Sequence, residues 1–266
     1  MKYYLTLFET TAAYNAATLD LPNVSLIEEN MNVTYNPYVA PETRIVATFN
    51  VTSTSSSTQL CNSSTVSQFS AIEIDGVTQQ SVISAYTFST IGEHTVKYIL
   101  TDPTSIGSSA FQGCTSLTNI DIPSSVTTIG SSAFYNCTSL TSIDIPSGVT
   151  TISANSFYNC TSLTSIVIPS GITSIGNFTF YGCSGLTSIN IPSGVTSIGM
   201  SAFYSCSSLA SIVSNATTAS TIQSNTFRNV NTGGTLTVQA GSTGYDVWMR
   251  TSNYYLGKYN WTKVEQ

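Results

Sequence analysis

Hydrophobic positions recur through the middle of this chain with a period of 23 residues, and polar positions fill the gaps between them. Each period holds an isoleucine, a phenylalanine, a cysteine and a leucine at fixed places, separated mostly by serine, threonine and asparagine. The phenylalanine column comprises Phe111, Phe134, Phe157, Phe180 and Phe203. A fixed period of this length predicts a solenoid, because each repeat can bury its apolar side only against its neighbours.

The repeat from Ile106 to Thr128 indicates how one coil is built. Leu117, Ile120 and Ile122 have the L-x-x-L-x-L spacing of a leucine-rich strand, so both isoleucines should point inward. Pro123 cannot donate a ladder hydrogen bond and should end the strand. In each later repeat, the segment before the phenylalanine predicts a single helical turn on the convex side.

The ends of the repeat array are less regular than its middle. A fifth copy begins at Ile198, a degraded sixth turn contains Ile222 and Phe227, and a partial turn with Phe88 and Ile99 precedes the first full copy. Strands of adjacent coils should lie about 4.8 Å apart, so five or six coils would form a stack about 25 Å long. The predicted fold is therefore mainly β, with a short strand and a helical turn in each coil.

The repeat unit I-G-x-x-A-F-x-x-C-x-x-L-x-x-I-x-I-P-x-x-V-x-x covers roughly residues 104–230 and resembles the BspA-like leucine-rich repeats of bacterial surface proteins. That resemblance implies a leucine-rich-repeat solenoid, assigned here to residues 104–231. It also implies adhesion to host proteins and to other cells, without enzymatic activity in the repeats.

Residues 41–103 predict a separate β-domain. Residues 44–51 alternate as a strand, Asp75-Gly76 is a hairpin signal, and residues 86–100 predict two strands about a turn at Gly92. Short strands with turn signals predict a small sandwich. The segment YTFSTIGEHTVKYIL also resembles the last hairpin of immunoglobulin-like bacterial modules, and it would seal the first coil because terminal repeats need caps.

Residues 1–40 predict a third unit with a strand, a short helical stretch and a hairpin. The run FETTAAYNAATLDLPNVSLIEENMNVTYNPY, residues 8–38, resembles the opening segments of structural proteins from bacteriophages of gut bacteria. That resemblance implies docking on virion proteins, or assembly into a dimer or trimer, through this module. Lys2 is the only basic residue near the start and Glu9 interrupts the apolar run, so we expect no classical secretory signal.

Residues 232–266 depart from the repeat and are dense in aromatic residues. Residues 235–239 and 259–264 predict strands on either side of a helical turn. We expect a cap over the last coil, and the alternative is an adhesive or oligomerising end.

Charge is scarce in this sequence: 8% of residues are charged, only 7 are Lys or Arg, and the net charge is −6. Phosphate binding needs clustered basic residues, so nucleic acid is excluded as a partner. No apolar run approaches the roughly 20 residues of a membrane-spanning helix, so no membrane insertion is expected.

The cysteines predict buried thiols and not a disulfide framework. Five of the six occupy one column of the repeat: Cys114, Cys137, Cys160, Cys183 and Cys206. Side chains in such a column are parallel and pair poorly as disulfides. Zinc would require C-x-x-C pairs or nearby histidines, so we expect neither a metal nor a cofactor.

Asp121 and Asp144 are the only charged residues between positions 104 and 226, and they lie one repeat apart. Paired carboxylates can act as a glycosidase acid and base or can bind a cation. The equivalent positions in later repeats are Val167, Asn190 and Val213, which favours a solvated face over a tuned site. The sole histidine, His94, lies outside the repeats and is expected in solvent, so no triad is formed.

A tyrosine follows the phenylalanine in four repeats, at Tyr135, Tyr158, Tyr181 and Tyr204, with Gln112 first in the column. Tyrosine offers ring area and a hydroxyl at low entropic cost, which suits contact with proteins or glycans. The alternative is packing between coils that shields the phenylalanine column. The candidate binding surface therefore comprises these four tyrosines together with Asp121 and Asp144.

These features predict a non-enzymatic, surface-exposed binding protein. The first hypothesis is a fibre or decoration protein on the virion surface of a bacteriophage, which presents its repeats to proteins or glycans of a host cell. The alternative is a secreted BspA-like adhesin, extracellular or on the bacterial cell surface.

Overall fold

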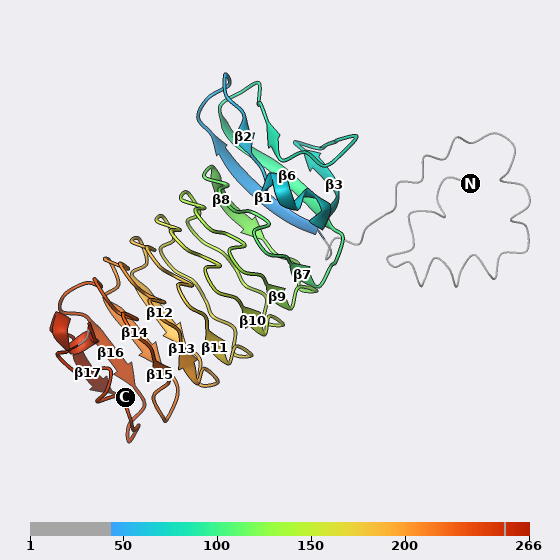
Figure 1. The fold of residues 1–266 in the computed structure, drawn as a ribbon. Coiled ribbons are helices and arrows are strands. Elements are labelled where there is room, and N and C mark those ends of the chain that lie inside the picture. The colour runs from blue at the N-terminus through green and yellow to red at the C-terminus, as the bar shows by residue number, and fades with distance from the viewer. Residues whose placement is uncertain (1–43, 253) are drawn as a thin grey trace, which may run out of the picture. The chain divides into compact units, whose positions relative to one another are not determined.

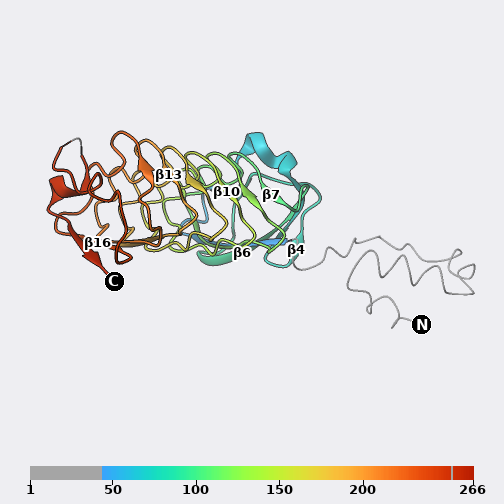
Figure 2. The same cartoon turned by 90° about the horizontal axis from the view of Figure 1, so that it is seen from below.

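The computed structural model describes residues 44–252 and 254–266, which form a stack of coils closed at each end by further strands and turns (Figures 1 and 2). Within these residues, helix is confined to two short 3-10 segments. The prediction of a mainly β solenoid is confirmed. The unit predicted over residues 1–40 lies outside the described residues, so its elements stay predictions.

Two parallel ladders run along the stack. The first contains the strand predicted from the leucine-rich spacing, in β8 (Leu117–Asp121), β12 (Ser188–Ile191) and β14 (Ser211–Ser214). The bridges Asp121–Asp144 and Val167–Asn190 mark the same row in the coils between β8 and β12. The second ladder was not predicted and joins short strands in two groups of three: β7 (Ser105–Ile106), β9 (Thr128–Ile129) and β10 (Thr151–Ile152), then β11 (Ser174–Ile175), β13 (Ser197–Ile198) and β15 (Thr221–Ile222).

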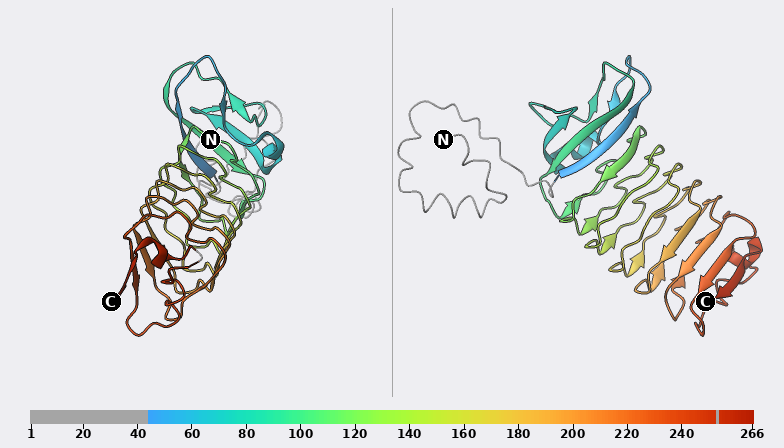
Figure 3. Two further views of the ribbon diagram at one scale, coloured as in Figure 1. Left: turned by 60° about the vertical axis from the view of Figure 1, so that its left-hand side comes forward. Right: turned by 180° about the vertical axis from the view of Figure 1, so that it is seen from behind.

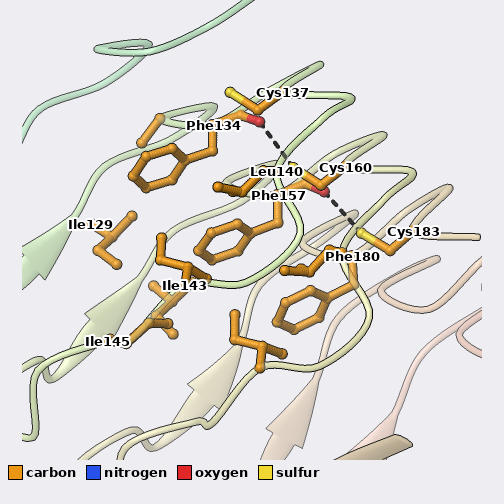
Figure 4. Close-up of a cluster of buried hydrophobic side chains, with 14 of the residues drawn as sticks. Ile129, Phe134, Cys137, Leu140, Ile143, Ile145, Phe157, Cys160, Phe180 and Cys183 are labelled. Atoms are coloured by element: carbon orange, nitrogen blue, oxygen red, sulfur yellow. Dashed lines mark hydrogen bonds between the residues drawn. The ribbon is translucent and has the colours of Figure 1, made fainter. Parts of the chain in front are cut away.

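The phenylalanine column forms a stacked ladder through the centre of the coils (Figure 4). From Phe111 to Phe227, neighbouring ring centroids lie 5.4–5.9 Å apart and the ring planes agree within 12°. All six rings are fully buried, and side chains such as Leu140 and Ile143 pack around them. The apolar interior of each coil is shielded from water because the next coil covers it. The shared core predicted from the repeat is therefore confirmed.

The helical turn predicted in each coil is wrong. Ser132 and Asn136 both adopt left-handed backbone conformations, with φ of 58°, and no helix is assigned around Phe134. No helix forms because alternate N–H groups in this segment donate hydrogen bonds to the next coil instead of to their own. Ser132 N donates to Ala154 O at 3.1 Å, and Phe134 N donates to Ser156 O at 2.8 Å.

The left-handed positions recur in two columns, which explains why glycine, asparagine and serine fill them. The first column is Ser109, Ser132, Asn155, Phe178, Ser201 and Asn225, and the second is Gly113, Asn136, Asn159, Gly182, Ser205 and Asn229. Asparagine and glycine tolerate positive φ far better than other residues. Phe178, at φ 58°, is the exception in the first column.

Replacing Phe178 with asparagine is expected to raise the free energy of unfolding by about 1 kcal/mol, because the left-handed conformation costs other residues about that much. The ring of Phe178 is only half-buried, and its centroid lies 6.1 Å from that of Tyr181. Urea denaturation followed by circular dichroism measures the change. Asn155→Phe, in the same column, should lower stability by a similar amount, and a destabilising Phe178→Asn would show that backbone strain is unimportant here.

Residues 44–100 form an antiparallel sheet that continues into the first coil, with strand order β4-β3-β6-β1-β8. Its own strands are β1 (Arg44–Val51), β3 (Phe69–Ile74), β4 (Val77–Thr78) and β6 (Gly92–Leu100). Asp75 and Gly76 join β3 to β4, and both have positive φ, as a type I′ hairpin requires. The predicted Asp-Gly hairpin is confirmed.

The immunoglobulin-like sandwich predicted for this region is not shown. Beside the five-stranded sheet, the described residues of this region, 44–103, form only the pair β2 (Thr58–Gln59) and β5 (Ala85–Tyr86), with η3 (Ser63–Gln68) leading into β3. The hairpin predicted about Gly92 is wrong, because β5 pairs with β2 and not with β6. Phe88 is buried against Tyr86 and His94, and this packing takes the place of a ladder between β5 and β6.

The N-terminal sheet packs against the first coil. The rings of Phe69 and Tyr98 lie 5.6 Å and 5.3 Å from that of Phe111, which is the first of the phenylalanine ladder. The Tyr98 hydroxyl donates to Leu60 O at 2.6 Å. Two aromatic rings therefore cover the end of the core, and their one buried hydroxyl has a partner.

The aromatic residues of the C-terminal segment pack against the last coil. Trp248 lies 5.4 Å from Phe227, between ring centroids, and its Nε1 donates to Ser220 O at 3.0 Å. Trp261 is also buried, and its Nε1 donates to Asn231 O at 2.8 Å. The elements of this cap are β16 (Thr235–Val238), η4 (Leu256–Tyr259) and β17 (Thr262–Glu265).

Candidate binding surfaces

The four repeat tyrosines form one stacked column, which we call the tyrosine stripe: Tyr135, Tyr158, Tyr181 and Tyr204. Their ring centroids lie 4.5, 4.5 and 4.6 Å apart, with planes within 8°. All four side chains are half-buried. Because the ring faces lie against each other, only ring edges and hydroxyls remain for a ligand. The interpretation as packing between coils is confirmed, and binding at the exposed rims stays a prediction.

The tyrosine stripe ends in alternating cations and rings. The Arg228 guanidinium lies 5.4 Å from the centre of the Tyr204 ring and 4.5 Å from that of Tyr254. Lys258 Nζ lies 3.9 Å from the centre of the Tyr254 ring. Cations over aromatic faces are stabilised by the ring quadrupole, so the C-terminal end of the stripe is electropositive. Arg228 occupies the tyrosine column of the sixth coil, a continuation that sequence analysis missed.

The hydroxyl of Tyr158, in the middle of the stripe, stays protonated at neutral pH. Partial burial raises the pKa of Tyr158, and the neighbouring phenols of Tyr181 and Tyr135 raise it further. The exposed rim of the stripe is a row of hydroxyl groups that donate and accept hydrogen bonds. Such a row suits hydroxyl-rich or amide-rich ligands and gives no long-range attraction to charged ones.

Asp121 and Asp144 are neighbours, as their one-repeat separation predicted. They form a parallel bridge, and both are exposed. No group of three or more His, Cys, Asp or Glu residues able to hold a metal occurs in the described part of the chain. Adjacent like charges repel, so the structure brings the two carboxylates together without adding the further ligands that a cation site requires.

The exposed side of the first ladder continues into the N-terminal sheet and forms one surface, which we call the strand face (Figure 3). Val46 of β1 pairs with Asp121, and Lys97 of β6 pairs with Val46 and with Glu73. The strand register and the 23-residue repeat place the following residues in one row along the strand face: Glu73, Lys97, Val46, Asp121, Asp144, Val167, Asn190, Val213, Thr237 and Val264.

The strand face is acidic at Asp121 and Asp144 and partly apolar elsewhere. Lys97 Nζ and Glu73 Oε1 form an ion pair at 2.6 Å, and Val167 is 70% exposed. Sequence analysis found the repeat part of this face and missed its extension into β1 and β6. The alternation of residues 44–51 was the available signal, but alternation does not identify the partner of a strand.

The cysteine column consists of buried free thiols, as predicted. All six cysteines are free and buried, and in the column Cys160 Sγ donates to Phe134 O at 3.2 Å. Burial raises the pKa of Cys61 to about 11 and that of Cys183 to about 12, and it raises the pKa values of the other four thiols well above normal. Nucleophilic and metal-binding cysteines are thiolates, so this column serves packing.

His94 is held inside the N-terminal sheet, and the prediction that it lies in solvent is wrong. Its side chain is 10% exposed, and its Nδ1 lies 2.7 Å from Asp75 Oδ2. The other ring nitrogen lies 3.0 Å from Thr90 O. The ring stacks on Phe88, with centroids 4.1 Å apart. Both nitrogens are engaged in tying the β3–β4 turn to β6, so this histidine has a structural role.

Comparison with known families identifies the repeats. Residues 104–234 match the model described as the BspA type leucine rich repeat region, in six copies. The repeats are therefore similar to the BspA type leucine rich repeat region, in agreement with the stacked coils of the fold, and nothing in the match points to catalysis. A search of curated proteins gives no match. None of the helices in the described residues is long and apolar enough to cross a membrane.

Solved structures similar to this chain are also leucine-rich repeat proteins. One from Bacteroides ovatus is 36% identical, with 57% of this chain and 37% of that chain covered and a TM-score of 0.44. The T. pallidum leucine rich repeat protein is 28% identical, with 60% and 78% covered and a TM-score of 0.43. A leucine rich cell surface protein from Faecalibacterium prausnitzii is 23% identical, with 53% and 60% covered and a TM-score of 0.29.

This chain spans little more than a third of the length of the Bacteroides ovatus protein. None of the comparisons supports the attachment to a bacteriophage virion that the resemblance of residues 8–38 implied. The alternative prediction, a BspA-like surface protein, agrees better with the family of the repeats.

Proposed function

We propose that the protein is a non-enzymatic adhesin, extracellular or displayed on a bacterial cell surface, that binds proteins or glycans of another cell. The observation that carries the proposal is the stacking of BspA-type repeats into one long exposed surface with almost no charge. Repeats of this kind build extended surfaces for recognition. The side chains on the strand face supply hydrogen bonds and a few apolar contacts, and in the described residues no further His, Cys, Asp or Glu joins Asp121 and Asp144 to hold a metal.

The tyrosine stripe is the surface that we assign to the ligand. Its four tyrosines occur once in each of four consecutive coils, and the column ends beside Arg228 and Lys258. Tyrosine is enriched in binding surfaces because it combines a rigid ring with one polar atom. Asp121 and Asp144 form a second candidate on the strand face, where they would accept hydrogen bonds from amides or hydroxyls.

The test is saturable binding of the fluorescent full-length protein to intact epithelial and bacterial cells, measured by flow cytometry. We expect saturation on at least one cell type and a loss of roughly tenfold in affinity for Tyr158→Ser combined with Tyr181→Ser. Tyr255→Ser, outside the stripe, is the matched control and should bind normally. Treating the cells with periodate or with protease then distinguishes a glycan from a protein ligand.

Two outcomes would count against this function. Absence of saturable binding to every cell type would remove the adhesin proposal. Normal binding by the double tyrosine variant would leave an adhesin but would exclude the stripe, and Asp121→Asn with Asp144→Asn would then test the strand face.

A further inference from the structure

The last strand of the first ladder has a free edge. In the described residues, the sheet order is β12-β14-β16-β17, so β17 pairs with β16 on one side only. Thr262, Val264 and Glu265 are exposed, and Val264 is 44% accessible. An unpaired edge presents N–H and C=O groups that can pair with another strand.

The hydrogen bonds between β16 and β17 determine which backbone groups of β17 point toward its free edge. Thr262 N donates to Gly234 O at 2.9 Å, and Gln266 N donates to Val238 O at 3.0 Å. Because backbone groups alternate in direction along a strand, those of Thr262, Val264 and Gln266 point toward β16. The N–H and C=O groups of Lys263 and Glu265 therefore point to the free edge.

These same two residues carry opposite charges on one side of the strand. Lys263 Nζ lies 3.1 Å from Glu265 Oε1, and Gly241 N donates to Glu265 Oε2 at 3.5 Å. The hydrogen bond from Lys263 lowers the pKa of Glu265, so the carboxylate is ionised at neutral pH. Lys263 pairs with Leu236 and Glu265 with Val238, which places both charges on the core side of the sheet.

We propose that β17 pairs antiparallel with β17 of a second copy of this chain, about a two-fold axis at Val264. In that register, Lys263 lies opposite Glu265 of the second copy, and Glu265 lies opposite its Lys263. Each of these pairs exchanges both backbone hydrogen bonds, because the outward groups belong to these residues. Val264 meets its own copy at the non-hydrogen-bonded site, where side chains approach most closely.

The charges select this register over its neighbours. A shift that centres the axis on Lys263 places lysine opposite lysine, and one that centres it on Glu265 places glutamate opposite glutamate. Like charges directly opposite each other destabilise a strand pair, and opposite charges stabilise it. The contact is small for an interface, so we expect a weak dimer with a dissociation constant of about 0.1–1 mM. Such a contact would act mainly where many copies are displayed together.

Charge exchange tests this pairing in the full-length protein by sedimentation equilibrium up to about 1 mM. Lys263→Glu and Glu265→Lys should each weaken the dimer by roughly tenfold or more. The double variant, Lys263→Glu with Glu265→Lys, restores complementarity and should return the dissociation constant to that of the original chain. Glu93→Lys, an exposed position on β6, is the control for net charge and should have no effect.

A purely monomeric protein over the whole concentration range would overturn the proposal. So would an oligomer whose dissociation constant is unaffected by the single exchanges, because that contact would lie elsewhere in the chain. A double variant as weak as either single variant would also overturn it, since specific pairing requires rescue. Circular dichroism of each variant excludes loss of the cap as the cause.

Discussion

Replacing Phe157 with alanine is expected to destabilise the protein by about 3–5 kcal/mol, the usual cost of removing a buried phenylalanine. The ring is fully buried in the middle of the ladder, 5.4 Å from Phe134 and 5.6 Å from Phe180 between centroids. A cavity at this point removes contacts from both neighbouring coils, and a solenoid has no other elements to compensate. Urea denaturation followed by circular dichroism gives the change in unfolding free energy.

Ser165→Ala in the same coil is the matched control, because Ser165 is exposed and should change stability by less than about 0.5 kcal/mol. A loss of less than about 1 kcal/mol for Phe157→Ala would mean that the ring is not part of a close-packed core. Phe111→Ala should cost a similar amount, since Phe69 and Tyr98 cover the end of the ladder.

Stability is also expected to fall steeply above about pH 8.5, the ordinary pKa of an unfolded thiol. Burial raises the pKa values of all six thiols in the folded state, to about 11 for Cys61 and about 12 for Cys183. The folded protein therefore keeps protons that the unfolded chain releases. This stabilising contribution is complete below the unfolded pKa and is lost as the pH rises toward the folded one. The slope approaches about 1.4 kcal/mol per thiol for each pH unit.

Unfolding free energies measured by urea denaturation between pH 7.5 and pH 10 provide the test. Cys160→Ala should make the fall of the unfolding free energy with pH less steep by the contribution of one thiol. This change in slope is expected whatever effect the substitution has on stability at pH 7. Constant stability through pH 10 would contradict the burial of the column. Burial also raises the pKa of Tyr98, which adds a loss of the same sign at still higher pH.

The repeat was the most informative part of the sequence because its columns report directly on packing. Phe134 and Cys137 recur at one spacing only if equivalent atoms meet in adjacent coils, and both are fully buried. Asp121 and Asp144 became neighbours for the same reason. Trp248 was expected in a cap because a solenoid must cover its last apolar surface.

Other features depend on backbone pairing that side-chain patterns do not specify. Ser132 and Asn136 suit a helical turn, a β-turn or a left-handed residue equally, and only the hydrogen bonds to the next coil decide among them. The pairing of β1 with β8 joins residues some 70 positions apart in sequence, for example Val46 with Asp121. The sandwich prediction failed to anticipate that pairing, because it treated residues 41–103 as closed upon themselves.

The central claim is that 23-residue coils stack in register around one ladder of phenylalanine rings. Nuclear Overhauser effects between ring protons of Phe134 and Phe157, in protein with labelled phenylalanine, test it most directly. Assignment can use Phe134→Leu and Phe157→Leu variants. With ring centroids 5.4 Å apart, strong ring-to-ring effects are predicted, and each variant should remove them. Rings that show effects only to protons of their own coil, or that exchange freely with solvent probes, would contradict the stacked core.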